Sequence, residues 1–251
     1  MHPFLIPIFV LLLQAVNLYN MSLKNKVAVL AGSKGAIAIS IAKMLLKENA
    51  IVIVPAQSAK DLLWIKQIEA VTGSGSIITM LADYPDFYRA EQMTDDIIER
   101  FGKIDLSIAC FESSSLTKPL NQVEITDWER TIEQNITAFF VAARLSFIGI
   151  KKSRRGMFIS IDFTNHTLKT EQAKLTRLSL CMQKEMAKMF FEEIKDTNME
   201  YYHLYVDPNK KKNKSQNNYI HPDELGALIL DLYDGNTKGK DPLFHWMHND
   251  H

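Results

Sequence analysis

Short apolar runs of four or five residues recur along the chain, and between them apolar residues return every three or four positions. The first pattern is typical of strands buried on both faces, and the second of amphipathic helices. Runs of the first kind predict strands at 27–30, 51–54, 77–80, 106–109, 157–161 and 202–206. This alternation predicts an α/β fold in which helices cover both faces of a parallel sheet.

Helical periodicity predicts the remaining elements. Apolar stripes occupy 62–71, 93–101, 128–140 and 175–194. Thr126 stands just before the third stripe and Glu129 follows it by three positions, a spacing that suits a capping box. Pro222 opens a late helix that runs through Leu232. The polar segment 209–218 is low in complexity, which predicts a loop.

The first strand leads into the most informative segment of the chain. After the apolar run come small residues at 31–35, and then an apolar-periodic helix. A strand, a tight turn and a helix N-terminus in this order form the corner that holds phosphate in dinucleotide-binding folds. The alternative interpretation is a plain strand–helix turn without a ligand.

Composition narrows the possible partners. The chain has 251 residues, of which 47% are apolar, enough for the core of one α/β domain. Basic and acidic residues number 29 each, so nothing favours nucleic acid or an anionic membrane surface. Cys110 and Cys181 have no partner motif, and we expect reduced thiols in the core. His245, His248 and His251 could form a weak metal site, but a terminal tail without metal is the preferred interpretation.

Residues 1–20 form an apolar leader that precedes a single predicted domain at 21–251. The leader has three interpretations: a signal or anchor, a docked apolar arm, or an overextended reading frame in which Met21 is the true start. The apolar run is too short to span a bilayer comfortably and lacks a positive n-region. An overextended reading frame that truly starts at Met21 is therefore the preferred interpretation, and it predicts a cytoplasmic protein. A signal or anchor would instead make the protein secreted or membrane-anchored.

Six landmarks share one order with a known family. The segment 31–38 (Ala-Gly-Ser-Lys-Gly-Ala-Ile-Ala) matches the family pattern Thr-Gly-x-x-x-Gly-Ile-Gly, and Lys174 matches the lysine of the family's Tyr-x-x-x-Lys. The other four landmarks are Ala82-Asp83 after the third strand, 101–105 before the fourth strand, Asn135 within a long helix, and Pro208 after the sixth strand. From about Leu23 to Met247 the chain therefore resembles the short-chain dehydrogenase/reductase family.

That resemblance implies a single Rossmann-type domain, a doubly wound parallel sheet of about seven strands with helices on both faces. It implies NAD or NADP as the cofactor. The residues it would assign to cofactor binding are Gly32, Ser33, Gly35, Ile37, Asp83 and Lys174. It would assign Asn135 and Lys174 to catalysis, with Thr170 in the position of the catalytic tyrosine. It also implies a homodimer or homotetramer that packs through helices at 126–151 and 174–194.

The chain departs from the family's pattern at several positions of this site. Ala36 and Ala38 stand where the family has glycines, and Ala56 stands where it has the acid that binds the ribose. Phe111 and Glu112 stand where it has a pair of small residues, and Phe163 stands where it has the catalytic serine. The family's tyrosine is the general acid, and a lysine cation lowers its pKa. The aliphatic hydroxyl of Thr170 is far too weak an acid to replace it. His166 is the titratable candidate for a substitute acid in this loop, unless it is a surface residue.

Three functional hypotheses follow. The chain could be an NAD(P)-linked oxidoreductase with a non-standard site. It could instead be a catalytically inactive relative, a pseudoenzyme that binds a nucleotide or a partner subunit. The third is an enzyme of another chemistry on the same scaffold. The sequence indicates neither the substrate nor the choice between NAD and NADP.

Overall fold

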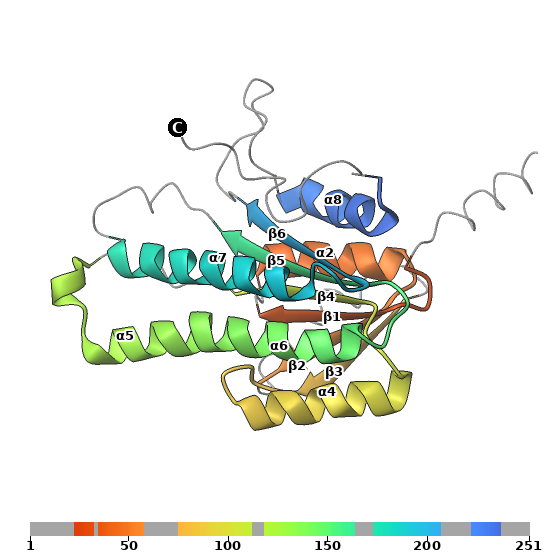
Figure 1. The fold of residues 1–251 in the computed structure, drawn as a ribbon, viewed down its shortest axis with the longest axis horizontal. Helices are drawn as coiled ribbons and strands as arrows, with labels where there is room; N and C mark the ends of the chain where they lie inside the picture. Colours follow the sequence, from red (N-terminus) through yellow and green to blue (C-terminus); the bar gives the residue numbers. More distant parts are fainter. Residues whose placement is uncertain are drawn as a thin grey trace, which may run out of the picture.

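The computed structural model describes residues 23–32, 35–57, 75–111, 118–163, 173–206 and 222–236. These residues form one parallel sheet in the order β3-β2-β1-β4-β5-β6 (Figure 1). Its strands are β1 (Val27–Gly32), β2 (Ile51–Ala56), β3 (Ser76–Leu81), β4 (Leu106–Cys110), β5 (Gly156–Phe163) and β6 (Met199–Val206). All six predicted strands are confirmed, and the described residues form six strands where the resemblance implied about seven.

Helices follow the strands as the periodicity predicts. They are α2 (Ala36–Lys47), α4 (Phe87–Phe101), α5 (Ile125–Thr131), the π-helical η3 (Ile132–Thr137), α6 (Ala138–Ile150), α7 (Lys174–Ile194) and α8 (Pro222–Asp234). A short 3₁₀ helix, η2 (Leu120–Gln122), precedes α5. The leader 1–20, the predicted helix at 62–71 and the loop at 209–218 lie outside the described residues.

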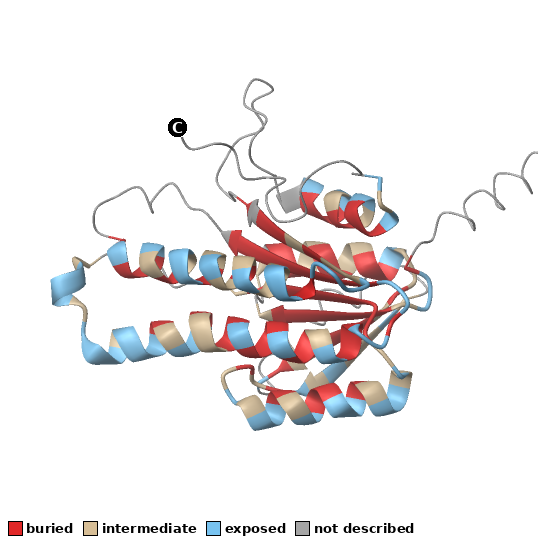
Figure 2. Ribbon diagram, viewed as in Figure 1, coloured by how far each residue is buried: buried red, intermediate tan, exposed pale blue. Residues whose placement is uncertain are grey.

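The sheet lies between two helical layers, as expected for strands that are apolar on both faces (Figure 1). One buried apolar cluster joins α2 and α8 to one face of the sheet, and a second joins α4, α6 and α7 to the other. The central strands are accordingly buried almost throughout, whereas the edge strand β3 has no buried residue; each helix is buried along one side (Figure 2). In the described part of the chain, no helix has the length and apolarity to cross a membrane.

Two local predictions are wrong. Helix α5 begins at Ile125, and its N-cap is Glu124, whose side chain makes no capping hydrogen bond. Thr126 is therefore already helical, whereas a capping-box residue must keep an extended backbone outside the helix. Cys110 is buried as expected, but Cys181 lies on an outward-facing position of α7 and is exposed.

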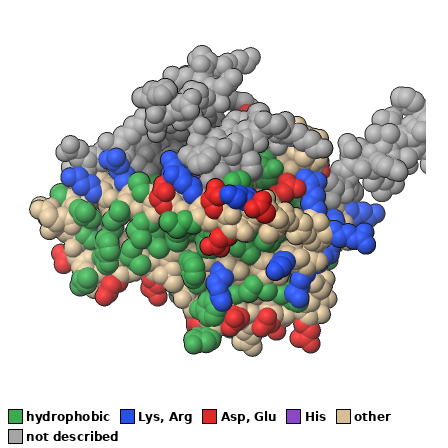
Figure 3. All heavy atoms as spheres, viewed as in Figure 1, with side chains coloured by type: hydrophobic (Ala, Val, Ile, Leu, Met, Phe, Trp, Pro, Cys, Tyr) green, Lys and Arg blue, Asp and Glu red, His purple; other side chains and the backbone are tan. Residues whose placement is uncertain are grey.

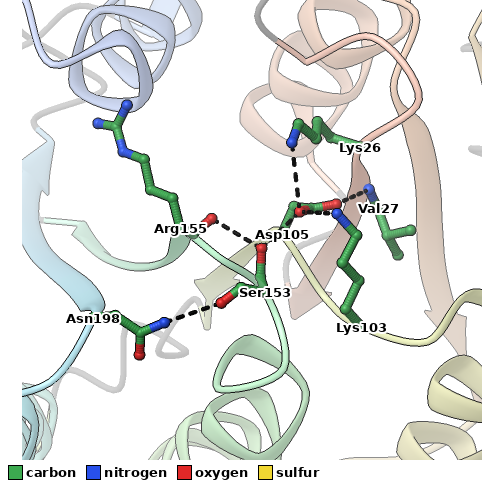
Figure 4. A network of polar contacts seen from close by, with 7 residues as sticks. All are labelled: Lys26, Val27, Lys103, Asp105, Ser153, Arg155 and Asn198. Carbon is green, nitrogen blue, oxygen red and sulfur yellow. Dashed lines mark hydrogen bonds and ion pairs between the residues drawn. The ribbon is translucent and has the colours of Figure 1, made fainter.

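A buried carboxylate joins the strands at the N-terminal edge of the sheet (Figure 4). Asp105 accepts hydrogen bonds from the Val27 amide at 3.0 Å, Lys103 Nζ at 2.7 Å and Ser153 Oγ at 2.8 Å. Asn198, just before β6, donates to the Ser153 carbonyl oxygen. Burial alone would raise the pKa of the Asp105 carboxyl, but these hydrogen bonds outweigh it and hold the pKa below its usual value.

Candidate functional site

A pocket of about 300 Å³ opens at the opposite, C-terminal edge of the sheet. The described residues that line it are Gly32, Pro55, Gln57, Ala82, Asp83, Tyr84, Pro85, Phe111, Gln134 and Ala138. They come from the ends of β1 and β2, from the turns after β3 and β4, and from η3 and α6. The strand order reverses between β1 and β4, so the pocket borders the topological switch point, where open α/β sheets bind their ligands.

Gly32 is the last residue of β1, and both its backbone conformation and the space around it require a glycine. Its φ is 97°, and a Cβ at this position would lie 2.3 Å from the carbonyl oxygen of Cys110, its partner on β4. The close approach of two strands therefore requires this glycine whether or not a ligand binds. The predicted site residue Gly32 does line the pocket, but its identity is explained by the sheet.

The turn that follows leads into α2, whose N-cap is Gly35. Gly35 has φ −84°, which any residue adopts, and α2 carries no acidic residue in its first turn. The side chains of Ile37 and Ala38 are buried in the core that α2 shares with α8, so neither faces the pocket. Ser33 lies outside the described residues.

Asp83 supplies the carboxylate of the pocket. Gln57 Nε2 donates a hydrogen bond of 2.7 Å to Asp83 Oδ1. The pair is brought together because Ala56 and Leu81 are register partners on β2 and β3, so the residues after these strands lie side by side. The sequence pointed to Asp83, and only the strand order shows that Gln57 lies beside it.

Two aromatic residues form another wall. Phe111 Cδ1 would lie 3.0 Å from a Cβ on Gly32, so the ring rests against the end of β1. Tyr84 meets Phe111 edge to face, with ring centroids 5.8 Å apart. Tyr84 is buried, and burial raises the pKa of its hydroxyl far above the usual value. This phenol therefore stays protonated at neutral pH, and among the described residues no cation offsets the effect of burial on its pKa.

Asn135 lies within η3, a π-helical segment of the kind often found at functional sites. Its side chain is buried and donates to the Thr131 carbonyl at 3.1 Å, and its own backbone carbonyl accepts a hydrogen bond from Gln183 Nε2 at 3.0 Å. Its Oδ1 atom is buried and has no hydrogen-bond partner among the described residues. Asn135 thus faces α7 in the interior, and it is its neighbour Gln134 that lines the pocket.

Lys174 is the first residue of α7 and is exposed. Helix α7 packs against η3, so Lys174 and Asn135 belong to neighbouring elements, but neither is among the described residues of the pocket. Thr170, His166 and Glu112 lie outside the described residues, as does the side chain of Phe163. Gly32 and Asp83 therefore lie together at the pocket, and the assignment of Asn135, Thr170 and Lys174 to catalysis stays a prediction.

A buried polar cluster between β5 and β6 was not predicted. Ser160 Oγ lies 2.6 Å from His203 Nδ1 and 2.9 Å from Tyr201 Oη, and His203 Nε2 lies 3.2 Å from Asp162 Oδ2. Sequence reasoning could find it only from the register, which pairs Ser160 with His203. A hydroxyl, an imidazole and a carboxylate can support nucleophilic chemistry, but these side chains are at most 3% exposed. Substrate cannot reach them, so we assign the cluster to the core.

Comparisons with known proteins agree with this architecture. The sequence model described as short chain dehydrogenase matches residues 26–172. A short chain dehydrogenase/reductase of Gibberella zeae is 26% identical over 143 residues, which cover 56% of this chain and 52% of that protein. Glucose 1-dehydrogenase 2 of Bacillus subtilis is 25% identical over 146 residues, 56% of this chain and 55% of that protein. The matched region thus spans about half the length of these curated relatives.

Solved structures extend the likeness over most of the chain. A metagenomic short-chain oxidoreductase crystallised in complex with NADP superposes with a TM-score of 0.70 at 19% identity, covering 84% of this chain and 91% of that one. At this identity the superposition shows the fold alone, whereas the family assignment rests on the match to the family's sequence model. The strand order, the pocket at the switch point and the match over residues 26–172 lead to one conclusion: this chain belongs to the short-chain dehydrogenase family.

Proposed function

We propose that this chain is a nucleotide-binding member of its family in which tyrosine-dependent hydride transfer has been lost. The observation that carries the proposal is the pocket at the switch point, which joins Gly32, Gln57 and Asp83. The family's scaffold is that of an NAD(P)-type oxidoreductase, and a structural neighbour was solved in complex with NADP.

The pocket has the chemistry that a nucleoside requires. Pro55, Pro85 and Phe111 offer apolar surfaces to a base, and the Asp83 carboxylate can accept a hydrogen bond from an exocyclic amine or a ribose hydroxyl. The N-terminus of α2 follows Gly35, and the positive end of the helix dipole there favours a phosphate. Among the described lining residues there is no lysine or arginine.

The site offers no comparable support for catalysis of hydride transfer. Reduction of a carbonyl needs a general acid whose pKa is near the working pH. Thr170 stands where the family has its tyrosine, and a threonine hydroxyl cannot serve. In the described part of the chain, Lys174 is exposed at the start of α7 and the phenol of Tyr84 has a strongly raised pKa. These observations favour binding over turnover.

Nucleotide titration tests the proposal. Thermal unfolding and calorimetry would be followed with AMP, ADP, NADH and NADPH. A ligand at a thousand times its Kd should stabilise the fold by about 4 kcal/mol. Asp83→Ala should abolish the stabilisation, while Asp95→Ala, on an exposed face of α4, should retain it. Failure of all four nucleotides to stabilise the protein would overturn the proposal.

An assay for hydride transfer tests the second half of the proposal. NADH and NADPH oxidation would be followed with a panel of ketones, and NAD and NADP reduction with alcohols. We expect no turnover above the background rate. Turnover would show that an oxidoreductase site exists, and Lys174→Ala would then report whether Lys174 belongs to it, since its loss should abolish the rate.

A further role in subunit association is favoured by one surface. Large apolar side chains are exposed on the neighbouring helices α5, α6 and α7: Ile125, Trp128, Phe140, Ile148, Met182 and Met189. Figure 3 shows hydrophobic side chains gathered over this part of the molecule. We propose that this helix face, 125–150 with 174–194, packs against its copy in a homodimer or homotetramer.

A further inference from the structure

Basic side chains gather at the N-terminal edge of the sheet, opposite the pocket. Strands β1, β4 and β5 are neighbours, so the segments that lead into them, 23–26, 102–105 and 151–155, lie side by side. The acidic residue of these segments, Asp105, is buried. Their basic residues are Lys24, Lys26, Lys103, Lys151, Lys152, Arg154 and Arg155. The chain has no net charge, but the fold collects these cations into one surface, which we call the basic edge.

Some of these cations already have a partner within the chain. Lys26 and Lys103 contact Asp105, and Arg155 Nε donates a hydrogen bond of 2.8 Å to Glu200 Oε1. The remaining cations are exposed and form no ion pair with any described residue; they are Lys24, Lys151, Lys152 and Arg154. Figure 3 shows Lys and Arg side chains at this end of the molecule. Their positive charges are therefore available to an anionic partner.

The sequence that precedes the basic edge is apolar. Leu23 begins the described chain one residue before Lys24, and residues 1–23 contain no Asp, Glu, Lys or Arg. The apolar run 4–16 is too short to cross a bilayer comfortably, but it suits a segment that lies in the membrane interface. Affinity for an anionic membrane grows with the apolar area inserted and with the cations near the lipid. Nucleic acid would use the cations and leave the apolar run unexplained.

We infer that the basic edge docks on an anionic lipid surface, with the apolar run 4–16 inserted beside it. The inference takes the leader as an anchor in place of an overextended reading frame, and it is independent of nucleotide binding. Continuity of the chain at Leu23 places the apolar run next to the basic edge. The pocket opens at the opposite edge of the sheet, so the docked protein keeps it accessible from solvent.

Flotation of the full-length protein with vesicles tests the inference. Vesicles of phosphatidylcholine alone would be compared with vesicles that contain ~30% phosphatidylserine. The protein should bind the anionic vesicles at least about tenfold more tightly. Raising the salt from about 0.1 M to about 1 M should weaken this binding, because the Debye length falls from about 10 Å to about 3 Å. Equal binding to both vesicles would overturn the inference, as would binding to a DNA duplex but to neither vesicle.

Matched triple variants test the basic edge itself. Neutralising its exposed cations by Lys151→Gln, Lys152→Gln and Arg154→Gln should weaken binding to the anionic vesicles at least about tenfold. Circular dichroism would confirm that the variants are folded. Equal effects of this variant and its control would overturn the role of the basic edge. The control neutralises exposed cations near the opposite ends of the helices and should bind like the wild type: Arg89→Gln, Arg130→Gln and Arg177→Gln.

A variant of the leader tests the apolar contribution. In the full-length chain, Leu11→Asp with Leu13→Asp should weaken binding to both kinds of vesicle, because charges oppose insertion into the apolar part of the membrane. The fold should keep its thermal stability, since both substitutions precede β1. Unchanged vesicle binding would overturn the role of the leader.

Discussion

At Gly32 the carbonyl oxygen of Cys110 occupies the space that any Cβ would need, and the backbone is left-handed. A glycine in the phosphate-holding corner is ordinarily interpreted as room for a ligand. Here the same glycine is required by the approach of β1 to β4. The residue therefore supports the fold independently of any nucleotide, and Asp83 with Gln57 becomes the better indicator of binding.

This interpretation predicts the effect of Gly32→Ala. The variant should lower the free energy of unfolding by at least about 2 kcal/mol, because a left-handed backbone alone costs an alanine about 1–2 kcal/mol and the contact with Cys110 adds to it. Urea unfolding without nucleotide measures the loss. Gly35→Ala is the control, since Gly35 has an ordinary backbone, and it should cost only the N-cap preference of glycine over alanine, about 0.5–1 kcal/mol. Equal stability of the two variants would contradict the prediction.

At the scale of elements, Asp105 links β1, the segment before β4 and the turn before β5 (Figure 4). Its ionised form accepts the hydrogen bonds, so its folded pKa lies below the unfolded value. A carboxyl of this kind stabilises the fold fully above the unfolded pKa of about 3.9, and the contribution disappears as the pH falls through the folded pKa.

Asp105→Asn should therefore destabilise the protein in a pH-dependent way. At pH 7 the loss should be about 2–3 kcal/mol, because buried donors lose a charged acceptor. As the pH falls through the folded pKa of Asp105, the difference from the wild type should shrink, since the carboxyl then becomes neutral like the amide. Urea unfolding at pH 7 and over a series of acidic pH values measures it, with Glu192→Gln on the surface of α7 as a control that stays near zero. A loss that does not change with pH would show that charge is not responsible.

Elements differ in how far their local sequence predicts them. The strands follow from apolar runs, because the central strands are buried on both faces and leave no polar alternation. The start of α5 was mispredicted because Thr126 and Glu129 fit a capping pattern, whereas the helix begins at Ile125 with Glu124 as its N-cap. The π-helical turn at Asn135 has no sequence signal, and in the structure the carbonyl oxygen of Asn135 accepts a hydrogen bond from Gln183 of α7.

At the scale of the molecule, the apolar stripe of α7 divides between two environments. Leu175, Ala187 and Ile194 are buried in the chain, while Met189 is 63% exposed. On α6, Phe140 is likewise exposed and stacks on Phe190 of α7. Because the apolar stripe is wider than the core can cover, part of it stays exposed as an apolar surface. Such a surface is the expected property of an association face.

The proposed association predicts the behaviour of surface variants. Sedimentation velocity should show a dimer or tetramer for the wild type, and Phe140→Lys with Met189→Lys should shift it toward monomer, because charges would be buried at the interface. Tyr88→Lys is the control, because Tyr88 is 81% exposed on α4 and outside this surface. A wild-type protein that is monomeric at micromolar concentration would contradict the proposal.

Apolar periodicity and the order of landmarks lie in neighbouring residues, and they were enough to predict the six strands, the long helices and the family. They also placed Gly32 and Asp83 at strand ends. The contacts of these residues depend on the fold, in which Gly32 lies against Cys110 and Phe111, and Asp83 lies beside Gln57. Strand register brings these residues together from distant parts of the chain, and it has no local signature.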